Sequence, residues 1–414
     1  MLQDYKRTKL ACYTAYFTMS SIFSLPPLLF VTFREMYGIS YTLLGTLVLI
    51  NFCTQLMVDL VFTAFSKHFN IALTVRLMPC LTALGLLIYA LVPNFFPEYA
   101  YWGLVAGTIL FSVSAGLSEV LLSPTIAAIP SDNPQRDMSM LHSLYAFGVF
   151  TVVMVSTLFL RFFGNENWMY LTIFLALWPL LASVLFFLSP MPSMQSESTE
   201  RRDSKAGKHA KIGLALCVGC IFFGSCSENT MSNWISGFIE NALHIDKTLG
   251  DILGMAMFAI LLGMTRILYA KFGRNVGKML LTGMIGAAVC YLVVSLSSGT
   301  VPALLAAAFT GIFTAMLWPG ALILMEENIP HVGVAAYALM AAGGDLGASI
   351  APQLMGIVID HVSVSNLALH ISAQTGLTAE QVGMKVGMLV TSAFPIIGAV
   401  VLVITLRYFR KHKM

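Results

Sequence analysis

A few ionisable side chains interrupt the long apolar stretches of this sequence, and these are the residues with which it could do chemistry. The stretch G-L-S-E-V-L-L-S-P places the carboxylate of Glu119 among apolar residues. An unpaired charge is costly to bury, so such a group usually has a partner, faces water or changes its protonation state. It could carry a proton, bind a polar solute or close a gate. The ionisable groups in such stretches are Asp59, Glu119, His142, Glu228, Arg266 and Asp345.

The composition indicates which environment surrounds these groups. Of the 414 residues, 57% are hydrophobic and only 10% are charged, and the mean hydropathy is +0.81. A soluble domain is usually about a quarter charged, and a chain this apolar cannot bury its hydrophobic surface within itself. We therefore expect a polytopic membrane protein. The first apolar run, 10–33, is longer than a signal-peptide core and lacks a small-residue cleavage site, so no cleavable signal is expected.

The apolar stretches are long enough to cross a bilayer as helices. About 20 helical residues span the hydrocarbon core, where every backbone polar group must be paired. We predict an all-α fold of twelve transmembrane helices in two pseudo-symmetric halves, 1–188 and 212–414, joined by a solvated linker at 189–211 that is rich in Ser, Pro and charge. The predicted spans are 9–33, 40–64, 73–93, 99–129, 139–162, 167–189, 212–237, 249–271, 277–297, 301–325, 333–359 and 383–408.

The placement of basic residues predicts the orientation. Most of the 23 Lys and Arg residues fall in segments that share a side with the N-terminus, the linker and the C-terminus. The positive-inside rule places that side in the cytoplasm. We therefore expect a multi-pass protein of the inner (plasma) membrane with both termini cytoplasmic. In the longest outer loop, Thr378 and Gln381 match a capping box, and we expect a short surface helix leading into the last span.

Glu119 shares one helical face with hydroxyl-bearing residues. Thr108, Ser112 and Ser123 lie at spacings that place their side chains on the same side of a helix as Glu119. We predict that Glu119 carries a proton, binds the solute or does both. The alternative is structural, a carboxylate bonded to a neighbouring hydroxyl that only holds helices together.

The stretch S-C-S-E-N-T-M-S-N-W is unusually polar for a membrane helix. Glu228, Asn229 and Asn233 could accept hydrogen bonds from the hydroxyls of a sugar, and the two amides could also donate. The indole of Trp234 could cover the apolar C–H face of the same sugar. Trp234 also lies near the outer end of its span, where membrane proteins carry an aromatic belt, and this alternative stays open.

The remaining ionisable groups have less specific patterns. His142 lies one turn from Tyr145, and because His changes charge near neutral pH it is a candidate for proton coupling and for solute binding. The equal alternative is a structural His whose hydrogen bonds are satisfied. Tyr145 is a candidate solute ligand. Asp59 and Arg266 fit gating ion pairs better than ligands. Asp345 is flanked by glycines that let helices approach closely. Ligand and structural roles are both open for it, and it is a candidate for proton coupling.

Several function classes lack their motifs. All seven cysteines lie in apolar runs, which argues against disulfides and a metal cluster, and no His and acidic residues at catalytic spacing indicate a membrane enzyme. No G-x-x-x-x-G-K-[ST] motif is present, so transport would be passive or driven by a gradient. We expect no cofactor, no metal and no nucleic-acid partner. The expected partners are a small solute, protons or another coupling ion, and the lipid bilayer, and we expect a monomer.

Short motifs recur in corresponding places of the two halves. L-L-S-P-T-I-A-A-I-P in the fourth span can be aligned with M-L-W-P-G-A-L-I-L in the tenth, matching Pro124 with Pro319. Further motifs are G-L-S-E-V-L-L-S-P in the fourth span, H-S-L-Y-A-F-G in the fifth, E-N-T-M-S-N-W in the seventh, T-A-M-L-W-P in the tenth and A-G-G-D-L-G in the eleventh. On these motifs the sequence resembles the major facilitator superfamily and, within it, the fucose-permease-like sugar–proton symporters.

The resemblance implies a transporter whose two six-helix halves rock around a midplane site. It departs from the family pattern in the first span, which lacks the acidic residue that the relatives imply for proton coupling. We predict a secondary active transporter of a small polar solute, a sugar or related neutral metabolite, with proton symport through Glu119, His142 or Asp345. Proton-coupled efflux of amphipathic drugs or metabolites is the alternative, because 24 Met and 28 Phe residues could line an adaptable pocket.

Overall fold

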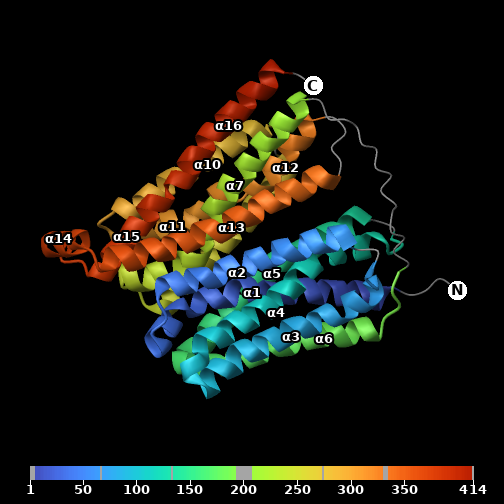
Figure 1. Cartoon of the computed structure of the whole chain (residues 1–414), viewed down its shortest axis with the longest axis horizontal. Helices are drawn as coiled ribbons and strands as arrows, with labels where there is room; N and C mark the ends of the chain where they lie inside the picture. The colour runs from blue at the N-terminus through green and yellow to red at the C-terminus, as the bar shows by residue number, and fades with distance from the viewer. Residues whose placement is uncertain are drawn as a thin grey trace. The chain divides into compact units, whose positions relative to one another are not determined.

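The structure, a computed structural model, describes residues 5–65, 68–131, 134–192, 208–272, 275–329 and 334–412. These residues are almost entirely helical (Figure 1). Eleven helical segments among them are long and apolar enough to cross a membrane, and α5 adds a shorter apolar stretch at Phe147–Phe163. The all-α membrane fold predicted from the sequence is confirmed. Most of the predicted linker lies outside the described residues.

The helices follow one another with short connections. In the N-terminal part they are α1 (Lys6–Tyr37), α2 (Tyr41–Phe65), α3 (Ile71–Phe95), α4 (Ala100–Ala127), α5 (Pro134–Phe163) and α6 (Trp168–Phe187), with 3-10 turns η2 (Pro97–Tyr99) and η3 (Asn165–Asn167) before α4 and α6. In the C-terminal part they are α7 (Lys208–Gly237), α8 (Lys247–Gly250), α9 (Met257–Phe272), α10 (Val276–Leu296), α11 (Thr300–Thr314), α12 (Leu317–Asn328), α13 (Val334–Ser363), α14 (Asn366–Thr375), α15 (Ala379–Thr391) and α16 (Ala393–Lys411), with π-helical turns η4 (Phe238–Ala242) and η5 (Asp251–Ala256).

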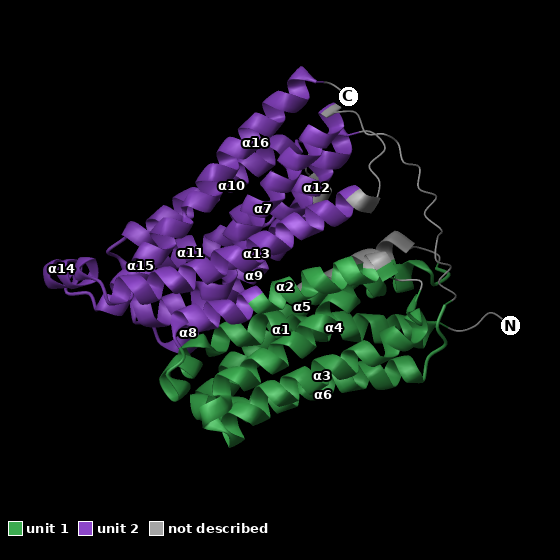
Figure 2. Cartoon of the chain, viewed as in Figure 1, with its two compact units in different colours: residues 1–39, 50–198 green, residues 40–49, 199–414 purple. Residues whose placement is uncertain are grey.

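Contacts divide the chain into two compact units (Figure 2). Unit 1 comprises residues 1–39 and 50–198, and unit 2 comprises residues 40–49 and 199–414. The boundary near residue 198 falls inside the predicted linker. Residues 40–49, which comprise the beginning of α2 and the residue before it, group with unit 2, which the sequence did not predict.

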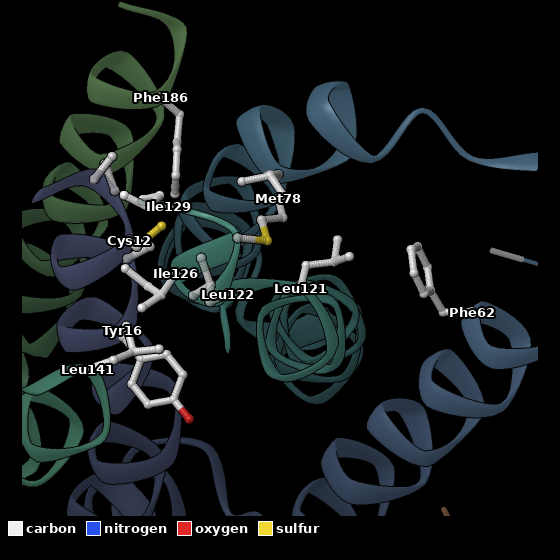
Figure 3. Close-up of a cluster of buried hydrophobic side chains, with 14 residues drawn as sticks. Cys12, Tyr16, Phe62, Met78, Leu121, Leu122, Ile126, Ile129, Leu141 and Phe186 are labelled. Atoms are coloured by element: carbon white, nitrogen blue, oxygen red, sulfur yellow. The ribbon is translucent and has the colours of Figure 1, made fainter. Parts of the chain in front are cut away.

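In unit 1 a cluster of buried apolar side chains surrounds α4, the helix that carries Glu119. Leu122 and Ile126 of α4 lie among side chains from α1, α3, α5 and α6 (Figure 3). The backbones of α3 and α4 also approach each other closely. A Cβ atom placed on Gly107 of α4 would lie only 2.7 Å from the carbonyl oxygen of Gly85 on α3. The cluster therefore holds α4 firmly against its neighbours.

In unit 2 the beginning of α2 is held by the side chain of Asp360 on α13. The Asp360 carboxylate accepts hydrogen bonds from the backbone N–H groups of the first two residues of α2, at 3.1 and 2.6 Å. These N–H groups have no partner within the helix, and an anion beside them is favourable. The Tyr41 hydroxyl also donates to Glu380 and accepts from Asn241. These bonds explain why this segment packs with unit 2.

The capping box predicted at Thr378 and Gln381 is confirmed. The Thr378 hydroxyl accepts from the Gln381 backbone N–H at 3.2 Å, and the Gln381 side chain accepts from the Thr378 N–H at 2.7 Å. It begins α15, which is already part of the last span. The short helix of this loop is α14, which ends at Thr375 and is capped by Gly376, where a φ of 72° suits glycine.

Candidate functional site

A polar seam joins α2 and α4 in unit 1. The Ser112 hydroxyl donates to the side-chain oxygen of Asn51 at 2.6 Å, and the Gln55 amide donates to the same oxygen at 3.0 Å. All three side chains are buried. One turn further along, a Cβ atom on Gly116 would lie 3.2 Å from the Gln55 carbonyl oxygen. Residue numbers rise together along the seam, so the two helices run in parallel and advance by about one turn at each contact.

The next turn of this seam brings two carboxylates to the same level, Asp59 on α2 and Glu119 on α4. Their charges lie close enough to interact. One carboxylate oxygen of Asp59 is buried with no hydrogen-bond partner, whereas Glu119 is exposed within its span. The sequence-based prediction separated these residues into a gate and a proton or solute site, and the structure brings them together. Their shared spacing from Asn51 and Ser112, in steps of three or four residues, was a signal in the sequence.

Aromatic side chains from α1 and α5 lie near Glu119. Tyr16 of α1 interacts electrostatically with Glu119, and its ring centroid is 6.2 Å from that of Tyr145 on α5. Tyr145 is half-buried and also meets Phe23 of α1 at 5.9 Å. Sequence reasoning missed Tyr16. The side chain of His142 lies outside the part of the chain that the structure describes in detail.

In unit 2 the carboxylate of Glu228 on α7 pairs with Arg266 on α9. One terminal nitrogen of the guanidinium lies 3.2 and 3.4 Å from the two carboxylate oxygens. The Arg266 side chain is 40% exposed and that of Glu228 is 20% exposed. A lone charge at mid-membrane would cost about 2.5–3.5 kcal/mol on insertion scales, so mutual pairing lowers the cost for both. Arg266, expected at a gate, therefore belongs to the same site as Glu228.

The second partner of Arg266 is a backbone carbonyl freed by a proline. The tenth predicted span breaks between α11 and α12, and the carbonyl oxygen of Ala315 lies at this break. In an unbroken helix this oxygen would accept from the N–H of residue 319, but Pro319 has none. The Nε–H of Arg266 donates to it instead, at 2.8 Å. The spacing of four between Ala315 and Pro319 was visible in the sequence, but it does not reveal which side chain fills the place.

The other polar residues of α7 are bonded mostly within their own helix. The Asn229 amide donates to the Ser225 carbonyl at 3.2 Å, and the Asn233 amide donates to the Asn229 carbonyl at 2.8 Å. Trp234 is 1% exposed, its indole N–H donates to the Pro352 carbonyl at 3.0 Å, and its ring lies 5.7 Å from that of Tyr41. In this conformation the Trp234 ring presents no open face to a solute.

Asp345 lies on α13, which packs closely along α7. The residue is buried, with 7% of its surface exposed. Nearby, a Cβ atom on Gly347 would lie 2.3 Å from the Phe222 carbonyl oxygen, so the two helix backbones touch here. This contact places the part of α13 that carries Asp345 against the same helix as Glu228.

Three solved structures of transporters resemble the whole chain. A D-xylose-proton symporter is 14% identical, with 94% of this chain and 96% of that chain covered and a TM-score of 0.73. A bacterial homologue of the human lysosomal transporter Spinster, inward-facing and unoccupied, is 13% identical, with 99% and 98% covered and a TM-score of 0.74. The nucleoside transporter NupG is 13% identical, with 97% and 98% covered and a TM-score of 0.69.

At these identities the structural likeness shows the fold alone. A search of curated proteins found no match. The profile of the Major Facilitator Superfamily matches residues 10–352, which is most of the chain. The protein therefore belongs to the Major Facilitator Superfamily and is a multi-pass membrane transporter, not an enzyme.

Proposed function

We propose that this secondary transporter moves a small polar solute, a sugar or related neutral metabolite, by proton symport with alternating access. The observation that carries the proposal is the electrostatic interaction of Asp59 on α2 with Glu119 on α4, one turn beyond the contact of Gly116 with α2. Two neighbouring carboxylates in a medium of low dielectric disfavour the state in which both are ionised. A proton shared between them relieves the repulsion and can satisfy the unpartnered oxygen of Asp59.

Glu119 is the more exposed residue of this pair. It is exposed although it lies inside a membrane span, and no ion pair to it is found among the described residues. A charged or protonatable side chain at this depth faces a cavity or another protein group rather than lipid. Exposure and the neighbouring acid together suit Glu119 to exchange protons with water. The first helix then needs no acidic residue of its own.

The polar groups of α7 and α9 suit a solute without strong net charge. Glu228 and Arg266 neutralise each other and still offer acceptor and donor positions to hydroxyl groups. Asn229 and Asn233 add side-chain oxygens on the same helix. A sugar fits this chemistry, as the resemblance to fucose-permease-like symporters implies. The similar fold of a D-xylose-proton symporter makes D-xylose a reasonable first probe.

We further propose that both termini are cytoplasmic, as the distribution of Lys and Arg predicts, and that the protein is a monomer of the inner (plasma) membrane. Efflux of amphipathic compounds is the second candidate, favoured by an apolar cavity of about 170 Å³ between α1, α5 and α6. Phe17, Phe174 and Trp178 are among its lining residues. Binding confined to hydrophobic cations would favour efflux over sugar uptake.

Glu119→Gln tests the proposal because Gln mimics a carboxyl group that cannot lose its proton. In proteoliposomes we expect the variant to lose accumulation of D-xylose, or of a binding sugar from a panel, driven by a proton gradient. It should keep exchange of labelled for unlabelled sugar at equal concentrations. Glu166→Gln, at an exposed carboxylate in the 3-10 turn η3 before α6, is the matched control and should behave as the wild type.

Full accumulation by Glu119→Gln would show that Glu119 carries no coupling proton. Loss of sugar binding and exchange together would instead make Glu119 a ligand first. Accumulation that is independent of the proton gradient in the wild type would reject proton symport.

A further inference from the structure

The carbonyl that Pro319 leaves unpaired organises the site around Arg266. We propose that Pro319 is a positioning residue. Because Pro319 has no N–H group, the Ala315 carbonyl oxygen has no partner within the helix and accepts a hydrogen bond from Arg266 instead. This hydrogen bond orients the guanidinium toward the solute. This inference rests on the proposed function for the identity of the solute, but the positioning of Arg266 can be measured without any solute.

Two acceptors on different helices define the orientation of the guanidinium. Its Nε–H group donates to Ala315 at the α11–α12 break, and one terminal nitrogen pairs with Glu228 on α7. A guanidinium is planar with five donors in a fixed fork, so two such contacts determine its plane. The side chain is nevertheless 40% exposed. Because a cationic group at this depth faces the interior of the helix bundle or a water-filled cavity rather than lipid, its remaining N–H groups are accessible to a solute.

The break itself is held in place by close packing on three sides. A Cβ atom on Gly224 of α7 would lie 2.8 Å from the Cβ atom of Leu317, and one on Gly344 of α13 would lie 2.3 Å from the Trp318 ring. Gly320 of α12 meets Leu280 of α10 in the same way, at 2.9 Å. The direction of the Ala315 carbonyl is therefore set by its surroundings. Gly224 is also one turn before Glu228, so one packing contact fixes both acceptors of Arg266.

The arrangement selects a class of ligand. The free N–H groups of Arg266 donate to oxygen acceptors, and the Glu228 carboxylate accepts from hydroxyl groups. A solute with neighbouring hydroxyls satisfies both at once, which a hydrocarbon or a simple cation cannot do. Substituting Pro319 with any residue that has an N–H group creates a competing donor for Ala315, and the guanidinium then loses one of its two fixed contacts.

The test is the rate at which phenylglyoxal, a reagent for guanidinium groups, modifies Arg266 in the purified full-length protein. Peptide mass spectrometry reports Arg266 and, as an internal reference, Arg76 of unit 1. We expect Pro319→Ala to raise the rate at Arg266 by roughly ten-fold, the loss of one hydrogen bond to a charged group. The rate at Arg76 should not change. Pro179→Ala, inside α6 of unit 1, is the matched proline control and should leave both rates unchanged.

The outcomes separate this inference from the proposed function. Pro319→Ser serves as a second variant should Pro319→Ala fail to fold, because Ser restores the same N–H group. An Arg266 rate equal to that of the wild type in the folded variants would overturn the positioning role, as would an equal rise in Pro179→Ala. Protection of wild-type Arg266 by D-xylose or another sugar of the panel would support the ligand class. A rate change in the variants without protection by any sugar would keep the positioning role and reject the sugar.

Discussion

Glu119 in unit 1 and Glu228 in unit 2 occupy similar places but have opposite surroundings. Each lies within a membrane-spanning helix, and each follows a glycine where a neighbouring helix approaches closely, Gly116 in α4 and Gly224 in α7. Glu228 has a basic partner, Arg266, which also holds a backbone carbonyl. Glu119 has an acidic neighbour on α2. The two sites therefore differ in the residue nearest the carboxylate, which is basic at Glu228 and acidic at Glu119.

This difference predicts different tasks. A carboxylate paired with Arg keeps a fixed geometry, which suits the recognition of a solute. A carboxylate beside another carboxylate is relieved by a proton, which suits coupling. The unit 2 site should therefore be sensitive to the loss of contacts, and the unit 1 site to the loss of a titratable group. The following predictions test this contrast through the stability of the folded protein.

The aromatic side chains beside the two sites should differ most. Trp234 is fully buried and bonded to the Pro352 carbonyl, whereas Tyr145 is only half-buried. We expect Trp234→Ala to lower the free energy of unfolding by about 3–5 kcal/mol, as large-to-small changes in cores do. Tyr145→Ala should cost clearly less. Thermal unfolding in one detergent compares the two variants.

A stable Trp234→Ala variant with weakened sugar binding would contradict this expectation. It would show that Trp234 contacts the solute, in line with the interpretation drawn from the sequence, and that α7 rearranges to expose it.

The second prediction concerns the ion pair. Arg266→Met leaves the Glu228 carboxylate and the Ala315 carbonyl without their partner. We expect a loss of about 2–3 kcal/mol, less than for a fully buried pair because Arg266 is partly exposed. Glu119→Gln removes a charge that has no basic partner among the described residues, so it should change stability by no more than about 1 kcal/mol. Thermal unfolding of both variants provides the measurement.

The double variant Arg266→Met with Glu228→Gln is the control for this contrast. It removes both charges, so it should recover much of the lost stability. Equal losses in Arg266→Met and Glu119→Gln would mean that the two carboxylates do not differ in the way their surroundings indicate.

The sequence predicted the membrane helices and the polar face of α4 well, because both depend on local patterns. The stripe of Ser112 and Glu119 follows helical spacing, and the capping box at Thr378 depends on residues three apart. The pairing of Glu228 with Arg266 depends instead on how two spans pack against each other, and a single sequence does not show which spans are neighbours. The assignment of residues 40–49 to unit 2 likewise depends on Asp360, more than 300 positions away.

Interrupted helices mark a further limit of prediction from the sequence. Hydropathy treats 301–325 as one span, because an apolar helix with a break is as apolar as one without it. Pro319 indicates that a carbonyl is freed but not which donor takes it. Trp234 has the same ambiguity. An indole can cover a sugar, join an interfacial belt or fill a core, and its hydropathy is the same in all three positions.

The smallest expected effect comes from a third carboxylate, Asp137, which has a basic partner although it lies in unit 1. It occupies the first turn of α5, before the apolar stretch Phe147–Phe163, and so lies outside the membrane-spanning part. Lys9 and Ser131 donate to it. The hydrogen bond from Lys9, followed by that from Ser131, holds the pKa of Asp137 below its ordinary value.

A lowered pKa in the folded state gives stability that is fully present above the ordinary Asp pKa, about 3.9. It is lost as the pH falls through the lower, folded-state value. We expect the wild type to exceed Asp137→Asn by at most about 1 kcal/mol at neutral pH, and this difference should shrink below about pH 4. Thermal unfolding of both proteins across this range measures it. A difference that persists at the lowest pH would mean that Asp137 acts through its shape and not its charge. The contrast between carboxylates with and without a basic partner would then hold only inside the membrane-spanning part, where Glu228 is paired with Arg266 and Glu119 lies near Asp59.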